Sequence, residues 1–296
     1  MKKQHSILLS AGISLTMLLL SCSDLKNDLP VASSNAIVVH PAGWADTSSA
    51  AFHGNAIRAA GWDMRSCRRC HGLHYDGGTS NAPCIKCHTS IEGPENCTTC
   101  HGTPAPPPDL DGNTASTASG VGAHTIHLRG TGTYSATSVA CTGCHHVPGS
   151  VYEAGHIDST GRAKVVITEP LAIVRSGGIT PAPTYDLNSF QCSNTFCHGN
   201  WRLLRANSTH KSIYTDTSAT ASMSGSNYAP VWNGGALQKA CGTTCHALPP
   251  VGHKSHALAE CAGCHGDVID ATGKVSNKAK HINGKIDLVS GEQNFQ

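Results

Sequence analysis

The chain is short of the residues from which a protein usually builds its core. Aromatic residues make up 5% of its 296 residues and charged residues 14%, whereas glycine (31) and proline (15) are plentiful. Such a chain gains too little from apolar burial to offset the conformational entropy that it loses on folding. A self-sufficient globular core is therefore excluded. Either the chain is disordered, or it folds around a bulky apolar group that is not part of the polypeptide.

Basic charge is also scarce. The formal net charge is +2, and removal of Lys2 and Lys3 would leave 19 basic and 19 acidic side chains. No stretch of the chain forms the basic patch that nucleic-acid binding requires. We therefore expect no nucleic-acid partner.

The amino terminus carries an export pattern. Two lysines precede an apolar run from Ile7 to Leu20, which predicts a signal peptide over residues 1–21. The run is too short for a confident membrane-spanning helix. It ends in Leu-Leu-Ser-Cys, similar to a bacterial lipobox, so we expect acylation of Cys22 and a lipidated tether over residues 22–38. The alternative is ordinary signal cleavage, which leaves Cys22 as an incidental thiol.

What the chain does have is an excess of cysteine (15) and histidine (19). Fourteen cysteines form seven pairs, each followed at once by histidine. Five pairs have two intervening residues: Cys67/Cys70/His71, Cys84/Cys87/His88, Cys97/Cys100/His101, Cys141/Cys144/His145 and Cys261/Cys264/His265. Two are stretched: Cys241/Cys245/His246, with three intervening residues, and Cys192/Cys197/His198, with four.

This arrangement is typical of covalent haem attachment. Two thiols add to the vinyl groups of the haem, and the histidine after the second cysteine becomes the proximal iron ligand. Zinc sites and disulfides use cysteine pairs too, but neither needs a histidine after each pair. Seven such histidines would arise by chance on the order of once in a hundred million. We predict seven covalently attached haem c groups, and a disulfide remains the alternative at the two stretched pairs.

The remaining histidines outnumber the sites that they must complete. Eleven are left after the seven proximal ligands and His5 of the signal peptide are set aside. The pairs His124/His127 and His253/His256 have the spacing of one helical turn, which suits ligands to adjacent haems. The predicted distal ligands are His40, His53, His124, His127, His156, His256 and His281. Only four methionines occur, which argues against general His/Met ligation.

We predict a mostly irregular, haem-templated multihaem cytochrome c fold with short α-helices at the cysteine motifs and few strands. The expected parts are an N-terminal triheme module (39–110), a central single-haem segment (111–185) and a C-terminal triheme module (186–296). Residues 163–168 are the one convincing strand candidate, and residues 207–227 suggest a surface loop. With about 39 residues for each haem, the cofactors must pack closely.

Several segments resemble the Geobacter-type CxxxxCH/CxxCH multihaem cytochromes. They are CSNTFCHG at 192–199, CRRCHGLHYDGG at 67–78, FHG at 52–54, VGAH at 121–124, GHID at 155–158 and HING at 281–284. The resemblance implies a multihaem electron carrier, often a lipoprotein of the outer membrane or cell surface. The three-residue spacer after Cys241 departs from the family's pattern.

The predicted function is electron transfer rather than catalysis. Electrons would pass along the haems to other cytochromes or redox proteins, or to an extracellular acceptor, at the outer membrane or cell surface. A periplasmic location is the alternative. The rival function is that of a multihaem reductase with one catalytic haem, acting on a small oxyanion. The surplus of histidine and the absence of a C-x-x-C-K motif favour the carrier.

Overall fold

The computed structural model describes residues 39–102, 108–130, 132, 134–158 and 161–295. Its contacts divide the chain into two units, Met1–Trp62 and Asp63–Gln296. The signal peptide, the tether and Cys22 lie outside the described residues. The predicted module boundaries near residues 110 and 185 stay predictions.

The described part of the first unit contains one helix, α2 (His53–Ala59). Trp44 lies between two histidines of this unit. The His40 ring stacks on its indole at 4.4 Å and 8°, and His53 Nδ1 donates to its carbonyl at 2.9 Å. These contacts orient both imidazoles within the unit.

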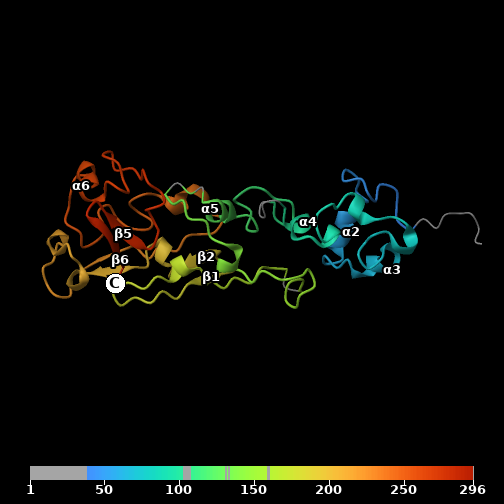
Figure 1. Ribbon diagram of the computed structural model, residues 1–296, viewed down its shortest axis with the longest axis horizontal. Coiled ribbons are helices and arrows are strands. Elements are labelled where there is room, and N and C mark those ends of the chain that lie inside the picture. The colour runs from blue at the N-terminus through green and yellow to red at the C-terminus, as the bar shows by residue number, and fades with distance from the viewer. Residues whose placement is uncertain (1–38, 103–107, 131, 133, 159–160, 296) are drawn as a thin grey trace, which may run out of the picture. The chain divides into compact units, whose positions relative to one another are not determined.

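Helices in the second unit are shorter still, and Figure 1 shows them as short coils between long loops. The α-helices are α3 (Arg68–His71), α4 (Cys97–His101), α5 (His124–Arg129) and α6 (Ala262–His265). The 3₁₀ helices are η1 (Arg65–Cys67), η2 (Gly78–Ser80), η3 (Cys84–Lys86), η4 (Gly93–Glu95), η5 (Cys141–Gly143), η6 (Pro170–Ile173), η7 (Phe196–His198), η8 (Arg205–Asn207), η9 (Lys211–Ile213), η10 (Gly235–Lys239) and η11 (Leu258–Glu260). In the described residues no helix is long and apolar enough to span a membrane.

Among the described residues the strands form three separate antiparallel pairs. They are β1 (Thr184–Asp186) with β2 (Gln191–Ser193), β3 (Arg202–Leu204) with β4 (Ser222–Ser224), and β5 (Lys285–Leu288) with β6 (Gly291–Asn294). Of these pairs, β1/β2 and β5/β6 are labelled in Figure 1. A two-stranded pair is marginally stable alone in water, so each pair depends on what packs against it. Leu203 lies opposite Met223, and Tyr185 lies opposite Cys192, which places one haem-motif cysteine on a strand.

Two local predictions were wrong. Residues 163–168 form no strand, because the neighbouring backbone belongs to the turn of the Cys141 motif and pairs through a single bridge, Val165 to His145. Residues 207–227, predicted to form a surface loop, contain η9 and strand β4. Met223 of β4 packs in the buried cluster with Tyr214.

The apolar core is small. Tyr214, Ala221 and Met223 form one buried cluster, against which Trp201, Leu203 and Ile213 pack. Many other large apolar side chains are exposed, among them Ile91 at 87% and Leu237 at 80%. The predicted class, mostly irregular with short helices and few strands, is therefore confirmed at this coarse level.

Candidate haem sites

The five regular cysteine motifs fold as single helical turns. In three of them the histidine N–H donates to the carbonyl of the first cysteine, four residues earlier: His88 to Cys84 at 3.0 Å, His145 to Cys141 at 2.9 Å and His265 to Cys261 at 2.9 Å. The other two histidines end helices α3 and α4. A turn of this kind keeps both thiols and the imidazole of one motif together.

The stretched Cys192 motif is built differently. Cys192 lies on β2, whereas Cys197 and His198 lie on η7. Between them, Phe196 is buried and packs edge-on against Phe295 at 4.7 Å. The two additional spacer residues thus let the chain leave a strand and enter a helical turn while anchoring an aromatic side chain.

The stretched Cys241 motif has no helix, although we predicted a short helix at every motif. Residues 241–245 lie in turns and bends that follow η10. Gly242 has a φ of +77°, in the left-handed region, which interrupts a right-handed helical turn at the second residue of the motif. The extra residue is accommodated by this break.

Six of the predicted attachment cysteines are exposed. They are one from each motif other than that of Cys192: Cys70, Cys87, Cys97, Cys141, Cys241 and Cys264. The other cysteine of each of these motifs is half-buried. The physical reason is that a single turn at the surface, in a chain with so few large apolar side chains, buries one sulfur atom against the polypeptide and leaves the other in solvent. Exposure leaves these six thiols accessible to a reaction partner.

Neighbouring motifs contact one another. Gly199, directly after His198, has a φ of +94°, and a Cβ there would lie 2.1 Å from the Cys245 carbonyl oxygen. The two stretched motifs therefore meet backbone to backbone. At the other end of this unit, Arg68 of the first motif forms a 2.5 Å ion pair with Glu95, two residues before Cys97.

The pKa shifts of the half-buried thiols also indicate that motifs lie close together. Burial, followed by the charge of Cys144, raises the pKa of Cys192 to about 12. Burial, with the charges of Cys245 and Cys144, raises the pKa of Cys197 to about 11. All fourteen described cysteines are free thiols. Three motifs that are distant in the sequence thus bring their sulfur atoms into one region.

Four of the seven motif histidines lie close to a histidine from elsewhere in the chain. The ring centroids are 6.1 Å apart for His101 and His156, 6.2 Å for His145 and His124, 6.3 Å for His198 and His127, and 6.4 Å for His246 and His281. In each pair, the second residue is a predicted distal ligand. Metal–imidazole bonds of about 2 Å on opposite sides of one metal would separate two ring centres by about 6 Å. The four centroid distances are close to this value.

The tautomers of these histidines also suit metal binding. In many of them Nδ1 lies within hydrogen-bond distance of a backbone carbonyl, which can only accept, so Nδ1 carries the proton and Nε2 keeps its lone pair. The carbonyl partners belong to Trp44 for His53, Ala82 for His71, Val121 for His124, Ala123 for His127, Lys164 for His145, Val151 for His156, Ala247 for His246, Lys254 for His253, Asp287 for His265 and Tyr134 for His281.

Burial keeps several of the imidazoles neutral. Burial, followed by the charge of His127, lowers the pKa of His198 to about 4. Burial is also the main cause that lowers the pKa of His101, His124 and His281. Neutral imidazole is the form that binds a metal. His198 Nδ1 is itself buried without a hydrogen-bond partner in the described structure.

Two further histidines act electrostatically on His265. Burial lowers the pKa of His265 most, and charges on His253 and His210 lower it further. His256 instead places Nδ1 3.5 Å from the carboxylate of Glu260. Residues 253–256 form no helix, so the predicted helical turn is absent there. His124 and His127, in contrast, do share helix α5. The spacing argument was therefore correct for one histidine pair and wrong for the other.

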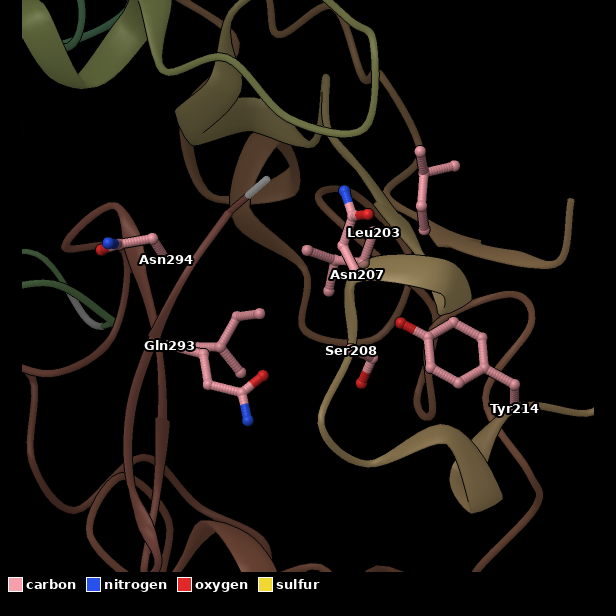
Figure 2. Close-up of a pocket in the computed structure, with 8 residues that line it drawn as sticks. Leu203, Asn207, Ser208, Tyr214, Gln293 and Asn294 are labelled. Atoms are coloured by element: carbon pink, nitrogen blue, oxygen red, sulfur yellow. The ribbon is translucent and has the colours of Figure 1, made fainter. Parts of the chain in front are cut away.

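Figure 2 shows a small pocket with Gln293 on one side and Asn207, Ser208 and Tyr214 on the other. The Gln293 amide Nε2 is 3.1 Å from His210 Nδ1. The Thr209 hydroxyl oxygen lies 2.9 Å from the same ring nitrogen, so two polar side chains hold the His210 ring.

Within the parts of the chain that the structure describes, no cluster of three or more His, Cys, Asp or Glu side chains is arranged to hold a metal ion. Comparisons of the chain with protein-family models, curated proteins and solved structures found no match. The functional argument therefore depends on the motifs and on the paired histidines.

Proposed function

We propose that the chain is a c-type cytochrome that carries seven covalently attached haems and transfers electrons. The observation that carries the proposal is the set of four facing histidine pairs, each joining a cysteine-motif histidine to a ring from outside the motif. When bound, haem c supplies a one-electron couple at its iron. The small apolar core supports a fold that forms around the haems.

The motif residues and the histidines outside the motifs would have different roles in haem binding. The cysteine pairs would hold the haem through thioether bonds, and the motif histidines would bind its iron. His156, His124, His127 and His281 would supply the second iron ligand beside His101, His145, His198 and His246, respectively. At the site of His265 we propose His253 as an alternative to the predicted His256, because burial and the charge of His253 lower the pKa of His265. His40 and His53 remain predicted distal ligands.

A second histidine close to each of these four motif histidines favours a carrier over an enzyme. A catalytic haem needs an open position at which a substrate can bind. The Nδ1–H hydrogen bonds orient the distal rings without a substrate, so iron oxidation and reduction would require little ligand movement. The contacts between neighbouring motifs support short distances between haems, which electron transfer requires.

The place of action follows from the sequence patterns. We propose export, acylation of Cys22 and anchoring to the outer membrane or cell surface, with other cytochromes, redox proteins or an extracellular acceptor as partners. Surface proteolysis of intact cells tests this location. Digestion of the anchored chain supports surface display, whereas protection would indicate the periplasm.

Carbon monoxide binding tests saturation of the iron. The reduced wild-type protein is expected to bind almost no carbon monoxide rapidly, whereas His127→Ala should open about one of seven haems to it. His146→Ala is the matched control, because the exposed His146 ring bonds the Glu153 carboxylate through Nε2. Fast binding by the wild type would instead favour the reductase.

A second pair of variants tests the ligand at His265. We expect His253→Ala to open one haem to carbon monoxide and His256→Ala to open none, because only the His253 charge acts on His265 among these two. The number of haems in each variant is determined by intact mass. The opposite result would restore His256 as the distal ligand.

A further inference from the structure

One tryptophan contacts the distal rings of two different sites. The Trp232 indole meets the His124 ring edge-on at 4.7 Å and 89°. The same indole stacks over the His127 ring at 5.7 Å and 23°. Both histidines lie on α5, yet His124 faces His145 and His127 faces His198. Trp232 is therefore shared by two of the proposed haem sites.

Trp232 is itself held firmly. Its Nε1–H donates to the Ser119 carbonyl at 3.1 Å, and its backbone N–H donates to the Phe190 carbonyl at 2.7 Å. The next residue, Asn233, donates from its side-chain amide to the Thr117 carbonyl at 3.0 Å. These bonds join the indole to the segment before α5 on one side and to the start of β2, which carries Cys192, on the other.

Gly122 makes room for the indole. Its φ is +45°, and an added Cβ would lie 2.0 Å from Trp232 Nε1. Any larger residue would have to displace the ring or the backbone. The close approach places the Trp232 indole next to the start of α5, the helix that carries both histidines.

The histidines need this additional constraint. The Nδ1–H of His124 bonds the Val121 carbonyl at 2.8 Å, and that of His127 bonds the Ala123 carbonyl at 2.9 Å. One hydrogen bond orients the N–H vector of a ring but leaves the ring able to rock about that vector. A flat indole in contact with both rings limits the remaining rotation.

From these contacts, and assuming the proposed function, we infer that Trp232 is a positioning residue that sets the ring orientations of His124 and His127 together. The ring planes are now 30° apart for His124 and His145 and 59° apart for His127 and His198. In low-spin ferric haem, the angle between the two axial imidazole planes controls the splitting of the iron d orbitals. Trp232 thus determines the electronic state of two neighbouring sites at once.

Electron paramagnetic resonance of the fully oxidised holoprotein tests the inference. In Trp232→Leu we expect about two of the seven low-spin signals to shift or broaden and the other five to stay unchanged. Trp232→Phe, which keeps a flat face, should move the same two signals less. Trp62→Leu is the matched control, since the Trp62 ring packs against the Arg58 guanidinium at 5.6 Å.

The outcomes separate the inference from the proposed function. Unchanged spectra in Trp232→Leu, with seven haems by mass, overturn the positioning role and leave the cytochrome intact. A wild-type chain without haem overturns both. If Trp232→Leu attaches fewer haems, the Gly122→Ala variant provides the test, because it displaces the indole without removing it. The inference requires the same two signals to shift in Gly122→Ala. Unchanged spectra of that variant overturn it.

Discussion

Replacement of Cys192 and Cys197 by serine is expected to remove one haem unit from the mass of the mature protein, which should carry seven units in the wild type. Serine hydroxyls do not add to haem vinyl groups under the conditions in which thiols do. The two thiols are close enough to other motif cysteines for Cys144 to raise the pKa of both. Intact mass spectrometry of the wild type and the variant measures the loss directly.

Two controls make this mass experiment decisive. Cys141→Ser with Cys144→Ser should also remove one unit, because that motif has the regular spacing. Ser193→Ala lies inside the stretched motif and should remove none. A wild-type mass with five haem units, unchanged by the Cys192/Cys197 substitutions, would mean that the stretched pairs are not attachment sites.

The chain produced without haem attachment is expected to lose its fold. The described helices have at most seven residues, and helices below about 12–15 residues are marginal in water. Ordering each residue costs about 1–2 kcal/mol of backbone entropy. The main buried cluster, built around Tyr214, Ala221 and Met223, is too small to offset that cost.

Limited proteolysis and circular dichroism of the holoprotein and the haem-free chain provide the measurement. The haem-free chain should be digested throughout, including the segment from Leu203 to Met223 that contains the apolar cluster, and should show no cooperative thermal transition. A cooperative transition without haem would show that the polypeptide has a sufficient core of its own, contrary to this interpretation.

The candidate sites were predictable because their chemistry is local. Five cysteine motifs fold as helical turns, which the two-residue spacer allows within the sequence itself. The i, i+3 spacing of His124 and His127 correctly predicted their place on one helix. The same spacing failed at His253 and His256, where no helix forms. Spacing alone does not report whether the surrounding chain supports a helical turn.

The exposure of individual thiols was not predictable from the motifs. Cys70, Cys87 and Cys264 are the second cysteines of their pairs and are exposed, whereas Cys97 and Cys141 are exposed first cysteines. The same two-residue spacer therefore occurs with either thiol in solvent. Which sulfur atom is half-buried depends on the segment that packs against each turn, and the spacer does not contain that information.

Tertiary structure decided which histidine faces which motif. His281 lies close to His246, and its Nδ1–H bonds the Tyr134 carbonyl, so its orientation depends on segments far apart in the sequence. Trp232 bonds the segment before α5 although the two are separated by more than a hundred residues in the sequence, and no sequence motif includes Trp232. Phe295 likewise packs on Phe196 of a stretched motif without any sequence pattern to indicate it.

The sequence by itself determined the chemistry of this protein: seven cysteine pairs with a histidine after each, a surplus of further histidines and too few apolar residues for a core. Those features are properties of the composition and of short spacings along the sequence, so they can be read without knowledge of the fold. Only the tertiary structure decided the opposed rings, their angles and the shared contact of Trp232 with His124 and His127. Such contacts join distant segments, and their geometry comes from backbone bonds and packing that no local pattern encodes.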